Sequence, residues 1–335
     1  MTLLCFLGLH DSQIIQHSNS TTANIKPYAN EIWSSLFAIA KNDDSKAVGA
    51  ECVGRLTIID PYSFLPELQK HLNSSDSSVR GMVISAIRYT FTDTLASYDD
   101  LLRPIVVDFL TGMVEDKESE NRRLALTALN SAAHNKPHLI MPHIEKLLPL
   151  VYRESVIRPE LVREVQMGPF KHKVDDGLEV RKSAYETLYA LLETSFSGID
   201  PVGFYTRVIA GLEDEHDIRV LCNLMLTKLT ILAKDETVTR VDDISEKFRT
   251  TLSFKPKDNA VKQELEKHAE LVRSTLRASV AVNKECGHIL TGDSPTGRGK
   301  KWLQYWDWVR GSFISEVRAL ELEEVGIGNV GGEVY

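Results

Sequence analysis

Cysteine and proline are scarce in this chain, and the cysteines show no spacing typical of a metal site or a disulfide framework. The 335 residues include four cysteines, Cys5, Cys52, Cys222 and Cys286, far apart and without a C-x-x-C pair. This distribution indicates a reducing compartment, so we expect a protein of the nucleus, the cytoplasm or both. Only 12 prolines interrupt the chain and 43% of its residues are hydrophobic, which excludes a disordered protein.

Positive charge is in deficit, and long apolar runs are missing. The chain has 39 Lys and Arg against 47 Asp and Glu, a net charge of −8. Nucleic acids and anionic membranes favour clustered positive charge, so we expect neither as a partner. No stretch reaches the roughly 18 apolar residues that a membrane-spanning helix needs. The apolar opening Met1–Leu9 lacks a basic region and a cleavage site, so it predicts part of a helix rather than a secretion signal.

Catalytic and cofactor-binding motifs are also missing. The chain has no Ser-His-Asp elbow, no H-E-x-x-H and no dinucleotide fingerprint. The segment Gly292–Gly297 resembles a phosphate-binding loop, but Arg298 and Gly299 follow where that motif needs Lys and then Ser or Thr. We expect no enzyme and no cofactor.

Three histidines, His134, His138 and His143, are spaced like metal ligands on a helix. Pro137 and Pro142 interrupt that segment, and no cysteine or carboxylate completes an obvious ligand set. We interpret the segment as a turn between helices and expect no metal.

A repeating helical pattern dominates what is present. Apolar residues recur at positions i, i+3, i+4 and i+7 or in steps of three and four, which places them on one helical face. Four segments show this pattern: Val79, Met82, Val83 and Ala86; Ala125, Ala128, Leu129 and Ala132; Val180, Ala184, Leu188 and Leu191; and Ile218, Leu221, Cys222 and Met225.

Each of these helices follows an acidic turn and carries a basic residue near its start. The turns contain Asp76, Asp116, Asp176, and Asp214 with Asp217, residues suited to cap free backbone N–H groups. A further apolar segment precedes each helix, and two of those segments open with Asp-Pro, at Asp60-Pro61 and Asp200-Pro201. The repeating unit is therefore helix, short acidic turn, helix.

The spacing of the basic residues gives the repeat length. Arg80, Arg122, Arg181 and Arg219 are separated by 42, 59 and 38 residues. Two of these spacings match the ~40 to 47 residues of HEAT-type repeats, which predicts an all-α solenoid. The long spacing contains an insertion of about 19 residues relative to a 40-residue repeat, at residues 153–175.

The insertion has the alternation of a β-hairpin. Leu161, Arg163, Val165 and Met167 alternate with Val162, Glu164 and Gln166; after Gly168-Pro169, residues Phe170, His172 and Val174 alternate with Lys171 and Lys173. A two-stranded hairpin is marginally stable alone. We therefore expect it either to lie against the repeats or, as we favour, to project toward a partner.

The whole chain divides into four predicted segments. We expect solenoid repeats over residues 1–283, with the hairpin insertion at about 158–175, then a loop over 284–300, a capping helix over 301–320 and a flexible acidic tail over 321–335. The capping helix places Trp302, Tyr305, Trp306 and Val309 on one face, either as the cap of the solenoid or as an exposed binding anchor. Two basic stretches, 255–262 and 298–301, predict a solvated face or an acidic protein partner.

Several strings resemble the cullin-associated, neddylation-dissociated (CAND, or TATA-binding-protein-interacting) family. They are Leu161–Lys182, Asn130–Pro137, Leu56–Pro61 and Asn259–Lys267, and the similarity is collinear from Leu3 to Val282. The resemblance implies a HEAT solenoid that is not an enzyme and regulates cullin-RING (SCF-type) ubiquitin ligases. Its C-terminal repeats would bind an unneddylated cullin at the adaptor-binding end, compete with the adaptor and promote exchange of substrate receptors.

The resemblance also implies a partner-binding site in the hairpin. Its residues are Val162, Arg163, Glu164, Val165, Gln166, Met167, Gly168, Pro169, Phe170, Lys171, His172 and Lys173. The chain is shorter than the full solenoid and matches its C-terminal part, so it is either a fragment or one subunit that pairs with a separate N-terminal solenoid, for which Met1–Leu9 would be the docking surface. Protection of the neddylation site would belong to the N-terminal part. The alternative is a general HEAT scaffold or transport adaptor that is not specific to cullins.

Overall fold

The computed structural model of the chain describes residues 28–38, 43–91, 96–167, 170–290 and 298–324. Two compact units divide the chain, residues 1–199 and residues 200–335, and each has its own helix pairs. The predicted segments Met1–Leu9, Gly292–Gly297 and 325–335 lie outside the described residues.

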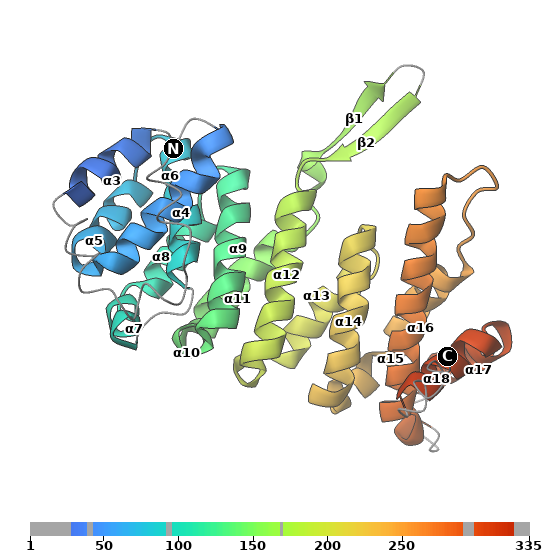
Figure 1. Cartoon of the computed structure of the whole chain (residues 1–335). Coiled ribbons are helices and arrows are strands. Elements are labelled where there is room, and N and C mark those ends of the chain that lie inside the picture. Colours follow the sequence, from blue (N-terminus) through green and yellow to red (C-terminus); the bar gives the residue numbers. More distant parts are fainter. Residues whose placement is uncertain (1–27, 39–42, 92–95, 168–169, 291–297, 325–335) are drawn as a thin grey trace, which may run out of the picture. The chain divides into compact units, whose positions relative to one another are not determined.

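In the described part of the first unit, helices form almost all of the structure, and one two-stranded sheet interrupts them (Figure 1). The elements are α3 (Ala29–Ala38), α4 (Asp43–Ile59), α5 (Pro61–Leu72), α6 (Ser77–Thr90), α7 (Ala96–Leu102), α8 (Val106–Val114), α9 (Ser119–Asn135), α10 (Pro137–Ile140), η2 (Met141–His143), α11 (Ile144–Glu154), η3 (Pro159–Leu161), β1 (Val162–Met167), β2 (Phe170–Asp175), α12 (Leu178–Ser195) and η4 (Phe196–Gly198). The predicted helix–turn–helix repeats and the hairpin are confirmed.

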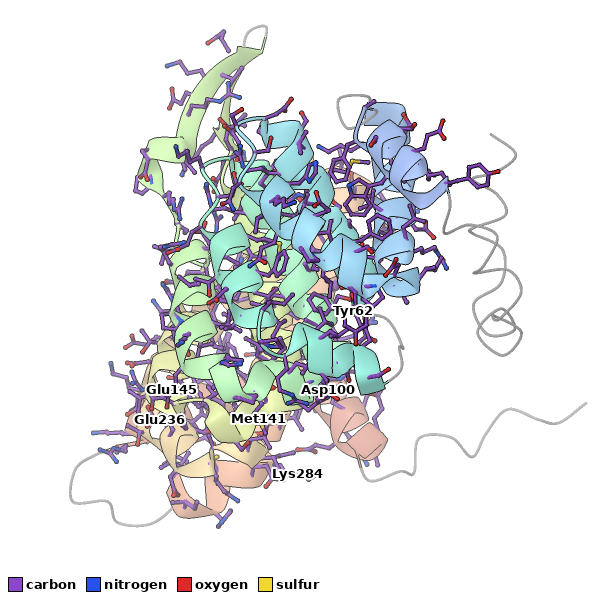
Figure 2. All side chains as sticks on the ribbon, turned by 90° about the vertical axis from the view of Figure 1, so that its left-hand side faces the viewer. Tyr62, Asp100, Met141, Glu145, Glu236 and Lys284 are labelled. Carbon is purple, nitrogen blue, oxygen red and sulfur yellow. The ribbon has the colours of Figure 1, made fainter. Side chains whose placement is uncertain are left out.

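The helices of the first unit pack in two layers. Helices α4, α6, α9 and α12 lie side by side in chain order, while α5, α8 and α11 each pack against the helix that follows them in sequence. Buried alanines let neighbours approach closely: Ala125, Ala128 and Ala132 of α9 are fully buried, as the pattern predicted. Tyr62, Met141 and Glu145 point to solvent from α5, η2 and α11 (Figure 2).

Arginines after the acidic turns bind the helix pairs together. Arg80 donates to both carboxylate oxygens of Asp116, Nε–Oδ2 2.7 Å and Nη2–Oδ1 3.0 Å, and to the Ser74 carbonyl at the turn before its own helix. Arg122 makes the equivalent contacts in the next helix pair. It donates to the Asp116 carbonyl at the turn before its own helix and to the Glu154 carboxylate. Each arginine therefore fixes its own turn and the turn of the next repeat.

The described part of the second unit contains α13 (Pro201–Gly211), α14 (His216–Leu232), α15 (Lys234–Ser253), α16 (Lys262–Leu290), α17 (Lys300–Ser312) and α18 (Ile314–Glu324). Helices α14, α16 and α18 pack in succession, and α13, α15 and α17 do the same. Asp200 begins α13 as predicted, since its carboxylate accepts hydrogen bonds from the N–H groups of Val202 and Gly203. At the other Asp-Pro pair, Asp60 occupies the cap position but accepts its hydrogen bond from the Ser63 hydroxyl.

Three C-terminal boundaries differ from the sequence prediction. The loop predicted over residues 284–300 is wrong for 284–290, because α16 continues to Leu290. Val282, Cys286 and Leu290, four residues apart, are buried and continue its apolar face through a polar surface run. The predicted helix over 301–320 is two helices separated at Phe313, and α18 continues to Glu324, into the predicted tail.

The tryptophan-rich segment forms a buried face, as the cap interpretation predicted. Trp302, Tyr305, Trp306 and Val309 are all buried, and the Tyr305 hydroxyl lies 2.6 Å from that of Ser279 on α16. Burial raises the pKa of the Tyr305 phenol. This face packs against α15 and α16, so the exposed-anchor interpretation of the four residues is wrong.

Candidate partner-binding site

The hairpin is an antiparallel ribbon that projects beyond the end of α12 (Figure 1). Its register pairs Val162 with Asp175, Arg163 with Val174, Glu164 with Lys173, Val165 with His172, Gln166 with Lys171, and Met167 with Phe170. Directly opposed residues share a face of a sheet. One face therefore carries the positions Val162, Glu164, Gln166, Lys171, Lys173 and Asp175, and is mostly polar. The other carries Arg163, Val165, Met167, Phe170, His172 and Val174.

Ten of the twelve predicted site residues fall in the two strands of this ribbon. Arg163, Glu164, Gln166, Lys171 and Lys173 are exposed, and Val162 and Val165 are half-buried. The backbone positions of Met167, Phe170 and His172 lie in the paired strands, while Gly168 and Pro169 lie outside the described residues. Glu164 and Lys171 form an ion pair with an Oε2–Nζ distance of 3.4 Å.

Charged residues tie the root of the hairpin to α12. Arg163 donates to both oxygens of Asp176, at 2.6 and 3.2 Å, and this hydrogen bond lowers the pKa of the exposed Asp176 carboxyl. The neighbouring Asp175 accepts from the Gly177 N–H at 2.9 Å and pairs with Arg181, whose side chain is only 3% exposed. Asp176 therefore binds Arg163 of the hairpin. It is not the cap of α12 that the sequence predicted, because Gly177 occupies the cap position.

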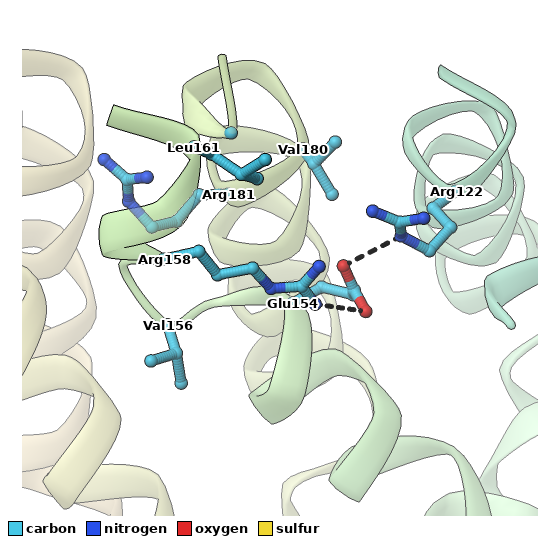
Figure 3. A pocket seen from close by; sticks show the side chains of 8 residues that line it. Arg122, Glu154, Val156, Arg158, Leu161, Val180 and Arg181 are labelled. Atoms are coloured by element: carbon cyan, nitrogen blue, oxygen red, sulfur yellow. Dashed lines mark hydrogen bonds and ion pairs between the residues drawn. The ribbon is translucent and has the colours of Figure 1, made fainter. Parts of the chain in front are cut away.

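A buried carboxylate anchors the other strand. Glu154, the last residue of α11, is 2% exposed in its side chain and accepts from Arg122 of α9 at 3.1 Å and from Arg158, just before β1, at 2.9 Å. These two guanidinium groups approach the carboxylate from different sides (Figure 3). Arg153 adds a third contact at 3.1 Å. The Glu154 carboxylate therefore connects the hairpin to the helical repeats.

Sequence reasoning missed Glu154 and Arg158. The signal for Glu154 was the repeat itself: Asp116, two residues after the end of α8, receives Arg80, which predicts an acidic residue near the end of α11 to receive Arg122. The cavity beside this cluster, lined by residues that include Arg122, Glu154, Leu161 and Arg181, has a volume of about 10 Å³. That is room for about one water molecule, so the site offers a protruding surface and no pocket for a small substrate.

The three histidines of the histidine-rich segment lie on three different elements, His134 on α9, His138 on α10 and His143 on η2. His138 lies with its Nε2 3.0 Å from Asp99, which also accepts from the buried Lys136, and His134 is exposed on α9. Within the described residues no three metal-ligating side chains come together. In that same part of the chain, no helix is long and apolar enough to span a membrane. Cys52, Cys222 and Cys286 are buried free thiols.

Comparisons with known proteins agree on one family. The family model described as TIP120, TATA-binding protein interacting (TIP20), matches residues 139–310, about half of the chain. The chain is 46% identical over 95% of its length to Cullin-associated NEDD8-dissociated protein 1, C-terminal part, of Emericella nidulans, and covers 30% of that protein. It is 42% identical over 80% of its length to Cullin-associated NEDD8-dissociated protein 1 of Drosophila melanogaster, and covers 22% of it.

Solved structures agree on the fold. Yeast importin-β (Kap95p) superposes with a TM-score of 0.60 at 12% identity, over 94% of this chain and 37% of that one. At this identity the likeness shows the α-solenoid fold alone. The chain spans less than a third of the length of the two relatives described above.

Proposed function

Because the chain belongs to the TIP120 family of TATA-binding-protein-interacting proteins, we propose that it regulates the assembly of cullin-RING ubiquitin ligases without catalysing a reaction. It binds an unneddylated cullin at the end that receives the adaptor. The hairpin occupies space that the adaptor needs, so adaptor and regulator displace one another and substrate receptors exchange. The names of the two relatives, which describe cullin association, support this partner.

The observation that carries the proposal is the anchored, exposed hairpin. Exposed main-chain edges and charged side chains make a two-stranded ribbon a contact element, but a free ribbon loses entropy when it binds. Here the buried Glu154 and Arg181 hold both ends of the ribbon before a partner arrives. A preorganised protrusion can exclude a competing adaptor at a smaller entropic cost.

We also propose that a separate N-terminal solenoid completes the functional regulator. The relatives are more than three times longer than this chain, so the whole protein's contacts extend beyond the repeats described above. When two such parts are joined, binding of one to the cullin raises the effective concentration of the other at its own site, so the pair binds more tightly than either part alone. Protection of the neddylation site belongs to that N-terminal part.

The test is a competition assay with purified cullin-RING complex. The intact chain is compared with a variant in which residues 162–174 are replaced by a short Gly-Ser linker, which keeps Arg158, Asp175 and Arg181 in place. We expect the adaptor to suppress binding of the intact chain, and to suppress binding of the linker variant less. A Tyr62→Ser variant is the control, because Tyr62 is 78% exposed on α5 and outside the hairpin.

Two results would contradict the proposal. One is equal suppression of the intact chain and the linker variant by the adaptor. The other is failure to bind the cullin complex even when the N-terminal repeats are supplied in trans. Cullin-independent cargo binding in that case would favour a general scaffold or transport adaptor.

A further inference from the structure

An open groove lies on the first unit where α6 and α9 pack side by side (Figure 1). Its volume is about 340 Å³, far larger than the cavity beside Glu154. The α9 side chains that line it include positions i, i+3, i+4 and i+7 of one helical face. Six side chains form this groove, all polar and none a carboxylate, and we call it the Arg88 groove: Arg88, Thr127, Asn130, Ser131, His134 and Asn135.

Among the described residues, Arg88 is the one arginine of the first unit without a carboxylate partner. The other nine arginines of that unit each pair with an Asp or a Glu. Arg88 is exposed, and its guanidinium carbon lies 5.3 Å from the centroid of the Tyr89 ring. Stacking on a ring leaves the N–H groups at the guanidinium edge available, and two of them match two oxygens of an oxyanion.

The α9 side of the groove supplies further donors that solvent reaches. His134 is exposed and makes no hydrogen bond or ion pair with the described residues. Ser131 accepts from the Asn135 amide at 3.3 Å, which leaves its hydroxyl proton available. Asn130 donates one N–H to the Glu186 carbonyl at 2.9 Å and retains a second. The groove therefore offers donors from two helices to one ligand.

The helix dipoles explain only part of this arrangement. Arg88 and His134 lie in the last turns of α6 and α9, where positive side chains are favoured. That effect accounts for a basic residue in each turn. It does not account for a groove without carboxylates in a chain of net charge −8, in a unit whose other arginines bind acidic residues. An anion from outside the chain supplies the missing negative charge.

A phosphoryl group matches these donors better than a carboxylate does. Its three terminal oxygens accept from the Arg88 guanidinium and from α9 at the same time, whereas a carboxylate has two oxygens. The volume of the groove exceeds that of one ion, so it admits the main chain beside a phosphorylated residue. A nucleic acid needs a series of cations along its backbone, and Arg88 and His134 are the basic residues among the six.

We propose that the Arg88 groove binds a phosphorylated serine or threonine of a protein partner. Arg88 donates to two phosphoryl oxygens, and His134 and Ser131 donate to the third. The side-chain amides of Asn130 and Asn135 bind the main chain beside the phosphorylated residue. This site lies outside the hairpin and does not depend on the cullin proposal.

The test uses the full chain and four probes. They are a nine-residue Gly-Ala peptide with a central phosphoserine, the same peptide with serine, inorganic phosphate, and a ten-nucleotide oligothymidine. With ¹⁵N-arginine labelling, we expect the phosphoserine peptide to shift the Arg88 Nε–H resonance. Titration followed by this shift should show that it binds at least about tenfold more tightly than each of the other three probes.

Arg88→Gln removes the guanidinium and should weaken binding of the phosphoserine peptide by at least about tenfold. Arg88→Lys keeps the charge without the two parallel donors, so it should restore only part of the affinity. Arg103→Gln is the matched control, because Arg103 is an exposed arginine of the same unit outside the groove. We expect the control to leave the affinity unchanged.

A second variant keeps the test valid if Arg88→Gln does not fold. His134→Gln changes an exposed side chain and should weaken binding of the phosphoserine peptide by at least about threefold. Equal affinity for the two peptides, an unmoved Arg88 resonance, or an equal effect of Arg88→Gln and Arg103→Gln would overturn the proposal. Inorganic phosphate or oligothymidine that binds as tightly as the phosphoserine peptide would overturn the assignment to a protein partner.

Discussion

Ion pairs of a few charged residues hold the base of the hairpin against the helices. Glu154 is the clearest case, because one carboxylate with a 2% exposed side chain receives Arg122, Arg153 and Arg158. A buried charge is stable only while its partners remain. The consequences of changing such residues are therefore large and local.

We predict that Glu154→Gln lowers the free energy of unfolding by about 3 kcal/mol, because Arg122, Arg153 and Arg158 lose the buried negative charge of the Glu154 carboxylate. Urea denaturation measures this change, and hydrogen exchange should show faster exchange of the β1 and β2 amides. Glu115→Gln is the control: the Glu115 side chain is half exposed and forms an ion pair with Arg153 at 3.5 Å, so its change should alter stability by less than about 0.5 kcal/mol. Similar losses for both variants would contradict this account of Glu154.

A pH effect is predicted for Asp116. Burial alone would raise the pKa of this carboxyl, but the hydrogen bonds from Arg80, the Glu118 N–H and Asn121 outweigh it and lower the pKa below 3.8. A depressed folded-state pKa stabilises the protein above the unfolded value, and this stability is lost as the pH falls through the folded pKa.

The loss of unfolding free energy caused by Asp116→Asn should therefore be largest near neutral pH and shrink below about pH 4. Urea titrations of the unchanged protein and the variant at matched pH measure it. Asp108→Asn, an exposed position on α8, serves as the reference. A cost that stays constant from pH 7 to pH 3 would show that the carboxylate charge is not what Asp116 contributes.

At the scale of elements, the start of α17 is fixed by a residue far away in sequence. Helix α17 begins after Gly299, whose φ of +83° favours glycine and whose missing Cβ would lie 2.7 Å from the Leu290 side chain. Glycine has no side chain to cap the helix. Asp242 of α15 does so instead, accepting from the N–H groups of Gly299 at 3.0 Å and Trp302 at 3.1 Å.

We predict that Asp242→Ala costs about 1–2 kcal/mol and loosens α17, because two N–H groups at its start lose their acceptor. Three of the four tryptophans lie in that helix, so intrinsic fluorescence should shift to the red at lower urea than in the unchanged protein. Asp243→Ala, at the exposed neighbouring position, should leave the transition in place. An unchanged tryptophan transition in Asp242→Ala would contradict the capping role.

At the scale of the whole molecule, stability is divided between two compact units. Solenoid repeats contact mainly their neighbours, so stability is close to a sum of local terms. Glu154 belongs to the first unit and Asp242 to the second, and among the described residues they share no hydrogen-bond or ion-pair partner.

The free energy of unfolding of the double variant Glu154→Gln/Asp242→Ala should therefore fall by the sum of the decreases in the two single variants, within about 0.5 kcal/mol. Calorimetry of the four proteins of this cycle measures the coupling. A coupling energy above about 1 kcal/mol would show that the two units unfold as one cooperative body.

The sequence alone determined the repeats, the hairpin and their order. Helical periodicity, the capping of α6 by Asp76 and of α13 by Asp200, and the strand alternation around Gly168-Pro169 all depend on residues a few positions apart. The family resemblance added the prediction that the hairpin is the partner-binding site. Local rules could not show where α16 ends, because Val282, Cys286 and Leu290 are buried by neighbouring helices behind a polar surface run.

Only the tertiary structure decided which charges meet. Arg80 binds Asp116 across 36 residues, Arg122 binds Glu154 across 32, and Asp242 caps Trp302 across 60. The same arginine pattern predicts a carboxylate for Arg219, and the structure places Thr251 there. The physical reason is that helix formation is governed by neighbours along the chain, whereas the partner of a side chain is chosen by the packing of helices that are far apart in sequence.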